Sequence, residues 1–215
     1  MKIARIKICL AAILFFCQVA AFSQSDEPIP KTQKLVREII ERSYPELKNA
    51  KIEIKTFESN SNYFKSQFSV SHFLSFRKIS YVLFVNAEVF RRNAPDDGIS
   101  AILAHELAHI LYYQRKNRFQ LLGLAALVDK SFTAKFERRA DLEAIMRGYA
   151  EGLKSYREWL YQNIPPNAVG AKKRNYFSPV EIDAMVLLLK EKPDLIDFWR
   201  KQVPRNLNDI SVAKQ

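Results

Sequence analysis

The alternation of apolar and polar positions in the first half of the chain predicts one helix followed by three strands. Residues 32–43 carry an apolar stripe at the spacing of an amphipathic helix, which Pro45 ends. Residues 51–57 alternate with a period of two, and most positions from Phe64 to about residue 76 do the same, so each segment predicts a strand. Residues 79–85 are apolar on both faces, which is typical of a central strand.

The second half of the chain is predicted to be mainly helical. An apolar helix begins near Pro95, with Asp96 and Asp97 in its first turn, and runs to about Gln114. Further helices are expected at residues 136–149, 151–162, 178–190 and 193–202, the third of which opens with a capping box, Ser178-Pro-Val-Glu181. The chain therefore predicts an α+β fold, in which a sheet of three or slightly more strands packs on the apolar helix and the C-terminal half is helical.

Two of the three histidines of the chain lie inside that apolar helix, in the motif His105-Glu106-Leu107-Ala108-His109. Residues four apart share one helix face, so His105 and His109 can hold one metal ion from the same side, with Glu106 beside it. Burying these side chains without partners would cost several kcal/mol each, roughly, and a bound cation supplies a partner. The alternative is a pair of core histidines that hydrogen-bond to backbone carbonyls.

A candidate third ligand lies on the following helix. Glu137 and Asp141 are one turn apart on the same face of that helix. Glu137 can reach the metal, while Asp141 can accept a hydrogen bond from the free ring nitrogen of a metal-bound histidine and fix its tautomer. Glu143 points elsewhere and is expected to be solvated or paired with Arg139 or Arg147.

The motif at residues 105–109, followed by Glu137-Arg-Arg-Ala-Asp141, resembles the gluzincin zinc metallopeptidases. The closest type is the CAAX-prenyl-endopeptidase and heat-shock-protease group with its soluble, minigluzincin-like members, and the match covers about residues 32–150. The resemblance implies a zincin-like fold with one Zn²⁺ per chain, held by His105, His109 and Glu137. It also implies Glu106 as catalytic base, Asp141 as the partner of His105, and a peptide that pairs antiparallel with a strand near residues 68–74.

The chain departs from the membrane-bound members of that group. Between the two motifs, the apolar run at residues 121–128 is only eight residues long. Because a membrane-spanning helix needs about twenty apolar residues, the soluble members are the better match.

The N-terminus predicts a secretory signal peptide. Lys2, Arg5 and Lys7 precede an apolar stretch, and small residues precede a cleavage site after Ser23. We therefore expect an exported protein, periplasmic or extracellular. Both cysteines of the chain, Cys9 and Cys17, fall in this signal, so the mature chain has neither a disulfide nor a thiolate ligand.

Composition is consistent with one exported domain. Removing Lys2, Arg5 and Lys7 with the signal lowers the formal net charge from +11 to +8. The basic residues are scattered in short groups, which argues against a nucleic-acid partner and allows a weak attraction to an anionic membrane surface. We expect a signal peptide at residues 1–23, a linker at 24–31, a metallopeptidase core at 32–150 and a helical C-terminal subdomain at 151–215.

A residue that stabilises the oxyanion of the reaction is harder to select from the sequence. His72, Tyr149, Arg157 and Tyr176 are candidates, but their spacing favours none of them. His72 lies on the apolar face of its predicted strand, which also fits a core histidine that is hydrogen-bonded inside the fold.

Together these features predict an exported zinc endopeptidase that acts on a peptide or an unfolded protein. A zinc-bearing module that binds a peptide or a partner without cutting it is the alternative. A structural domain in which the motif is fortuitous is the third interpretation.

Overall fold

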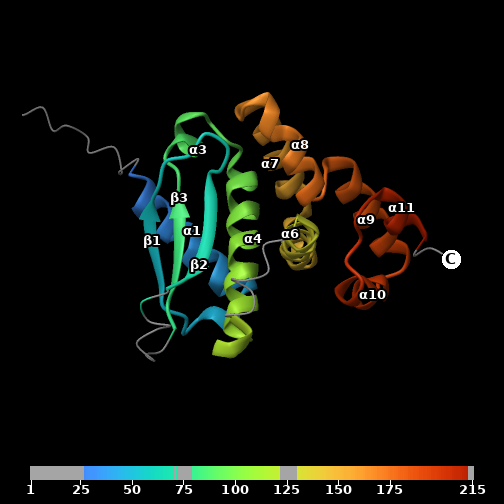
Figure 1. Ribbon diagram of the computed structural model, residues 1–215, viewed down its shortest axis with the longest axis horizontal. Coiled ribbons are helices and arrows are strands. Elements are labelled where there is room, and N and C mark those ends of the chain that lie inside the picture. Colours follow the sequence, from blue (N-terminus) through green and yellow to red (C-terminus); the bar gives the residue numbers. More distant parts are fainter. Residues whose placement is uncertain (1–26, 70, 72–78, 122–129, 213–215) are drawn as a thin grey trace, which may run out of the picture.

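The computed structural model describes residues 27–69, 71, 79–121 and 130–212 (Figure 1). It is an α+β structure in which a three-stranded mixed sheet lies beside helices, as predicted. The strands are β1 (Ile52–Thr56), β2 (Phe64–Phe68) and β3 (Tyr81–Val85), in the order β1-β3-β2. β3 is parallel to β1 and antiparallel to β2. β3 is thus the central strand that its apolar faces predicted, and four of its five residues are buried.

β2 is shorter than the long strand expected from residue 64 onward. It ends at Phe68, and one further backbone hydrogen bond joins Ser69 to Ser80. Residue 70 and residues 72–78, which include the candidate His72, lie outside the described part of the chain. Within the described residues, the strand pairing of β2 is with β3.

The first helix, α1 (Pro28–Ser43), begins four residues earlier than predicted. The expected linker at residues 24–31 is therefore helical from Pro28 onward. Proline is tolerated in the first turn of a helix because the N–H that it lacks would have no partner there. Thr32, Val36 and Ile39 are the buried residues of α1, and a short 3₁₀ turn, η1 (Pro45–Leu47), follows it.

The apolar helix, α4 (Asp96–Gln114), follows the short α3 (Glu88–Arg91) and lies between the sheet and the C-terminal helices (Figure 1). All residues of α4 from Gly98 to Leu111 except Ser100 are buried. α7 (Ala150–Asn163) packs closely on it. A Cβ atom on Gly152 would lie 2.8 Å from the Cβ of Ala101 and closer still to the carbonyl of Asp97, so this approach requires glycine.

Every element from Lys130 to Val212 is helical, as the sequence predicted for this half. α6 (Lys130–Ala144) continues into a π-helical turn, η2 (Ile145–Tyr149), in which Gly148 has a φ of 90° before α7 begins. The remaining helices are α8 (Pro166–Asn175), α9 (Pro179–Glu191), α10 (Leu195–Lys201) and α11 (Leu207–Val212). The capping box of Ser178 and Glu181 is present. In the described residues, no helix combines the length and the apolar character needed to span a membrane.

α8 was not among the helices expected from the sequence, where two consecutive prolines, Pro165 and Pro166, separate the helices expected at 151–162 and 178–190. In the structure Pro166 is instead the first residue of α8, where its fixed φ suits the start of a helix.

Candidate metal centre

Three side chains from two helices converge at one point, as the sequence predicted. His105 and His109 extend from α4 and Glu137 extends from α6. The Nε2 atoms of the two histidines are 3.1 Å apart. Glu137 Oε2 lies 3.1 Å from His105 Nε2 and 3.0 Å from His109 Nε2. Glu137 retains 19% of its side-chain exposure, so the cluster of these three residues is buried on the histidine side and open on the glutamate side.

The hydrogen bond at His105 Nδ1, the ring nitrogen that points away from the cluster, determines which groups Nε2 can bind. His105 Nδ1 lies 2.7 Å from Asp141 Oδ1, which is the predicted pairing. An ionised carboxylate only accepts hydrogen bonds, so Nδ1 carries the proton, and in the neutral ring Nε2 presents a lone pair. That lone pair points to a second imidazole nitrogen and to a carboxylate oxygen. Such a convergence of acceptors favours a bound cation.

The spacing of the three ligand atoms suits a small tetrahedral ion. Metal–ligand bonds of about 2.0–2.1 Å at a tetrahedral angle place neighbouring ligand atoms roughly 3.3 Å apart. The observed separations of 3.0–3.1 Å are close to this value. Two imidazoles and one carboxylate form a nitrogen and oxygen donor set that can hold zinc with a fourth position left for water.

Asp141 is fully buried and makes three hydrogen bonds. Its Oδ1 accepts from His105 and from Arg157 Nη2 at 2.8 Å, and its Oδ2 accepts from the backbone N–H of Phe177 at 2.9 Å. Burial raises the pKa of Asp141, but the Arg157 guanidinium and His105 more than offset this and hold the pKa below its usual value. Asp141 is therefore an ionised, rigid acceptor for His105.

The ligands themselves are electrostatically coupled. Burial lowers the pKa of His105, but the Asp141 carboxylate outweighs this effect and raises the pKa to about 9. Burial raises the pKa of Glu137, whereas attraction to His109 and hydrogen bonds to both histidines lower it below its usual value. In the metal-free protein a proton on His105 therefore competes with a metal ion for the same nitrogen.

Glu106 is buried beside the two histidines, with 5% of its surface exposed. The structure records no hydrogen bond to its carboxylate from any described residue, although its backbone carbonyl accepts one from Ser66 Oγ at 3.1 Å. That bond ties α4 to the middle of the edge strand β2. The carboxylate therefore lies next to the cluster, and in the part of the chain that the structure describes no hydrogen-bond partner competes for it.

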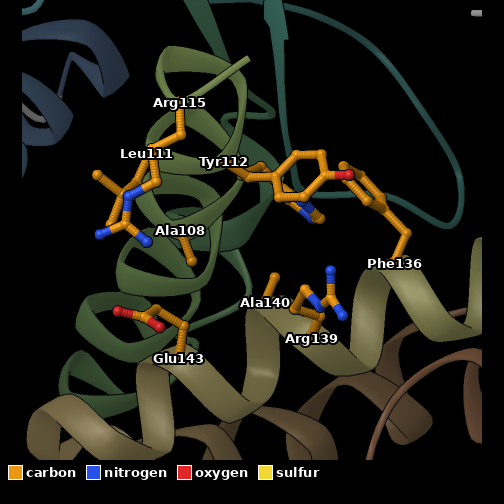
Figure 2. A pocket seen from close by; sticks show the side chains of 9 residues that line it. Ala108, Leu111, Tyr112, Arg115, Phe136, Arg139, Ala140 and Glu143 are labelled. Atoms are coloured by element: carbon orange, nitrogen blue, oxygen red, sulfur yellow. The ribbon is translucent and has the colours of Figure 1, made fainter. Parts of the chain in front are cut away.

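Aromatic rings surround His109. Phe136 stacks on the His109 ring at 4.3 Å between ring centres, and Tyr113 lies at 6.4 Å. A cavity of about 70 Å³ adjoins His109 and Phe136 between α4 and α6. Figure 2 shows Tyr112 and Phe136 on one side of it and Arg115 and Glu143 on the other. The cavity is lined by Ala108, His109, Leu111, Tyr112, Arg115, Phe136, Arg139, Ala140 and Glu143. Away from the cluster, His109 is thus held by ring packing, whereas His105 is held by the hydrogen bond from its Nδ1 to Asp141.

The structure does not bring two of the candidate oxyanion donors to the cluster. The hydroxyl of Tyr149 contacts α1, where it is 2.9 Å from Arg42 Nη2 and 3.0 Å from Ser43 Oγ. Arg157 is 1% exposed and hydrogen-bonds to the cluster only through Asp141. Glu143 pairs with Arg147, one of its two expected partners.

Tyr176 does lie at the cluster, with its ring 5.7 Å from the His105 ring. Burial and the nearby Glu137 raise the pKa of Tyr176 well above its usual value, so its hydroxyl stays protonated and can donate. Lys172, one turn earlier, has its Nζ 5.2 Å from the centre of the Tyr176 ring. The sequence did not indicate that Lys172 lies near Tyr176, because Lys172 belongs to one of several short basic groups in the chain.

No family model matches the chain, and the comparisons with curated proteins and with solved structures found no match. The resemblance to gluzincins, drawn from two short motifs, therefore remains a prediction.

Proposed function

We propose that this protein is a zinc-dependent endopeptidase of zincin-like fold. The observation that carries the proposal is the convergence of His105 Nε2, His109 Nε2 and Glu137 Oε2 within 3.1 Å, with Glu106 next to them on the same helix. When bound there, zinc would polarise the scissile carbonyl and lower the pKa of a bound water towards about 7. His105, His109 and Glu137 would hold the ion, and Asp141 would keep His105 in the tautomer that binds it.

Glu106 is the proposed general base. Its carboxylate is buried next to the histidines, where it can remove a proton from the attacking water and then deliver that proton to the leaving amine. Tyr176 is the proposed donor to the oxyanion, because its ring lies beside His105 and its hydroxyl stays protonated. Arg157 and Tyr149 have structural partners instead.

The edge of β2 opposite β3 is the proposed peptide-binding surface. β2 packs on α4 through Ser66, which bonds to the Glu106 carbonyl. A peptide that adds to this edge by backbone hydrogen bonds would be recognised with little dependence on its side chains. This suits a peptide or an unfolded protein as substrate. Export through a signal peptide at residues 1–23 also remains a proposal, since that segment lies outside the described residues.

The test compares purified mature protein with Glu106→Gln and with Glu151→Gln, a control carboxylate that is exposed at the start of α7. We expect the wild type to bind one zinc ion and to cleave an unfolded protein until a chelator is added. Glu106→Gln should keep the zinc but lose activity by about 100-fold or more, while Glu151→Gln should behave as the wild type.

Three results would contradict the proposal in different ways. Full activity of Glu106→Gln would show that Glu106 is not the general base. Stoichiometric zinc without cleavage of a broad peptide library would favour a metal-bearing binding module. Absence of stoichiometric metal after native purification would favour a structural domain.

A further inference from the structure

A cavity of about 570 Å³ lies where α6 meets the C-terminal helices, and most of the polar side chains around it are basic. It is bounded by α6, by the end of α8, by the start of α9 and by residues 203–206, which precede α11. Figure 1 shows α9, α10 and α11 on the side of α6 away from the sheet. The cations that line this basic cavity are Lys135, Arg138, Lys173, Arg174 and Arg205.

The positive charge of the basic cavity is largely unbalanced. Its one lining carboxylate, Glu181, already accepts from Arg138 Nη1 at 2.8 Å and from Ser178 Oγ at 2.8 Å. Each of the remaining four basic side chains lacks an ion pair with a carboxylate in the part of the chain that the structure describes. These four like charges around one cavity repel one another, so a bound anion would stabilise the arrangement.

A second cavity, of about 690 Å³, adjoins the basic cavity and extends its charge toward α10. Lys135 and Arg205 line both cavities, so they lie where the two meet. The second cavity adds Lys201 and one carboxylate, Asp209. Asp209 Oδ2 accepts from the backbone N–H of Arg205 at 2.8 Å, so this carboxylate is engaged in holding the start of α11.

Convergence from separate parts of the chain distinguishes these cations from the other short basic groups. Lys135 comes from α6, Lys173 and Arg174 from α8, and Arg205 from the segment before α11, and all four are exposed. Solvated cations on a convex surface point apart, whereas a hollow lined by one sign of charge concentrates counter-ions inside it. The arrangement therefore favours an anionic ligand.

Phosphate suits this set of side chains better than a single carboxylate does. A phosphate monoester carries a charge of about −1.5 to −2 at pH 7 and three strong acceptor oxygens, so it can bond to several cations at once. A guanidinium matches phosphate with two parallel hydrogen bonds, and Arg174 and Arg205 can each supply them. Among the described residues that line the basic cavity none is aromatic, so a nucleobase would find no ring to stack on.

We propose that the basic cavity binds a phosphate group, held by Lys135, Arg174 and Arg205. The proposal goes beyond the peptidase function and does not depend on it, because none of the candidate metal ligands lines either cavity. The phosphate group can belong to a free compound or to the headgroup of a lipid in an anionic membrane. Both sources present the same oxygens to the same cations.

The first experiment titrates the protein with inorganic pyrophosphate in a calorimeter. We expect Lys135→Gln/Arg205→Gln to weaken binding by about 10-fold or more, since hydrogen bonds between charged groups are the stronger ones. The matched control is Lys34→Gln/Arg37→Gln, which removes one lysine and one arginine that are exposed on α1 and line neither cavity. It should bind pyrophosphate within about twofold of the wild type, and thermal unfolding checks that each variant folds.

Two outcomes of this titration would overturn the proposal. Equal weakening in both double variants would mean that pyrophosphate responds to net charge alone. Undiminished binding by Lys135→Gln/Arg205→Gln would place pyrophosphate elsewhere, and a metal ion at the candidate cluster would be detected in this way, because that variant keeps all three candidate ligands.

The second experiment identifies the source of the phosphate. Sedimentation with phosphatidylcholine vesicles that contain phosphatidic acid is compared with sedimentation with pure phosphatidylcholine vesicles. Capture that requires phosphatidic acid and is lost only in Lys135→Gln/Arg205→Gln supports a lipid headgroup, whereas pyrophosphate binding without such capture supports a free compound. Failure to bind either probe would overturn the proposal. So would binding of hexaglutamate as tight as that of pyrophosphate and equally dependent on Lys135 and Arg205, since an acidic peptide would then be the better ligand.

Discussion

Two buried arginine–carboxylate pairs lie in the C-terminal half of the molecule, and they differ in what the carboxylate does next. Arg157 binds Asp141, with both side chains at most 1% exposed, and Asp141 also binds His105. Arg138 binds Glu181, with exposures of 4% and 9%, and Glu181 also closes the capping box with Ser178. The first pair fixes a candidate metal ligand and the second fixes the start of a helix.

The comparison shows that a buried ion pair is not in itself a sign of function. Both pairs have the same chemistry, and each places a guanidinium over an aromatic ring, Tyr176 for Arg157 and Phe177 for Arg138. The two pairs differ in what else the carboxylate binds, which is His105 for Asp141 and Ser178 for Glu181. Changes in the two pairs should therefore have similar consequences for stability and different consequences for metal binding.

The largest effect is expected for Asp141→Asn. The change leaves Arg157 buried without its counter-charge, which should lower the free energy of unfolding by about 3–5 kcal/mol. It also removes the anion that orients His105, so zinc affinity should fall by about 10- to 100-fold. Urea denaturation and zinc competition with a chelator measure the two effects. Unchanged zinc affinity would show that the Asp141–His105 bond does not orient the ligand.

Glu181→Gln is the matched change in the other pair. Because Arg138 and Glu181 are slightly more exposed, we expect the free energy of unfolding to fall by about 3 kcal/mol, at the lower end of the range for a broken buried pair. Zinc affinity should stay within about twofold, since Glu181 has no contact with a ligand. A loss of zinc affinity as large as that of Asp141→Asn would contradict the distinction between the two pairs.

The metal-free protein should lose stability as pH rises from about 7 to 9. The pKa of His105 is about 9 in the folded state against the ordinary 6.5. Its stabilising proton is therefore fully present below pH 6.5 and is lost as pH passes through 9, at roughly 1 kcal/mol per pH unit. Zinc competes with that proton, so stabilisation by zinc should increase over the same range. Metal-free His105→Gln is the control. Because this variant lacks the titrating group, its free energy of unfolding should not show this fall between about pH 7 and 9.

The smallest effect is expected for Ser178→Ala. It removes one side of the capping box and should destabilise the protein by about 1 kcal/mol. Glu181 keeps its bond to Arg138, so the pair itself survives. Thermal unfolding measures the loss, and a zinc titration identical to that of the wild type is expected. A shift in the zinc titration would mean that the two regions are coupled through α9.

Much of the fold could be predicted from periodicity alone. The period of two in residues 51–57 and the apolar faces of residues 79–85 gave β1 and the central β3 within one or two residues. The i, i+4 spacing of His105 with His109 and of Glu137 with Asp141 set which side chains share a helix face. Helix boundaries were harder to predict, because Pro28 begins a helix inside the expected linker and Pro166 begins α8, where no helix was expected.

The sequence by itself determined the ligand candidates, since spacing along one helix is a local property. Only the tertiary structure decided which of the remaining polar residues reach them. Arg157 and Tyr149 were equal candidates in the sequence, yet one binds Asp141 and the other binds α1. Lys172 lies near the cluster because α8 packs on α6. Packing between helices depends on faces and crossing angles that no short stretch of sequence contains.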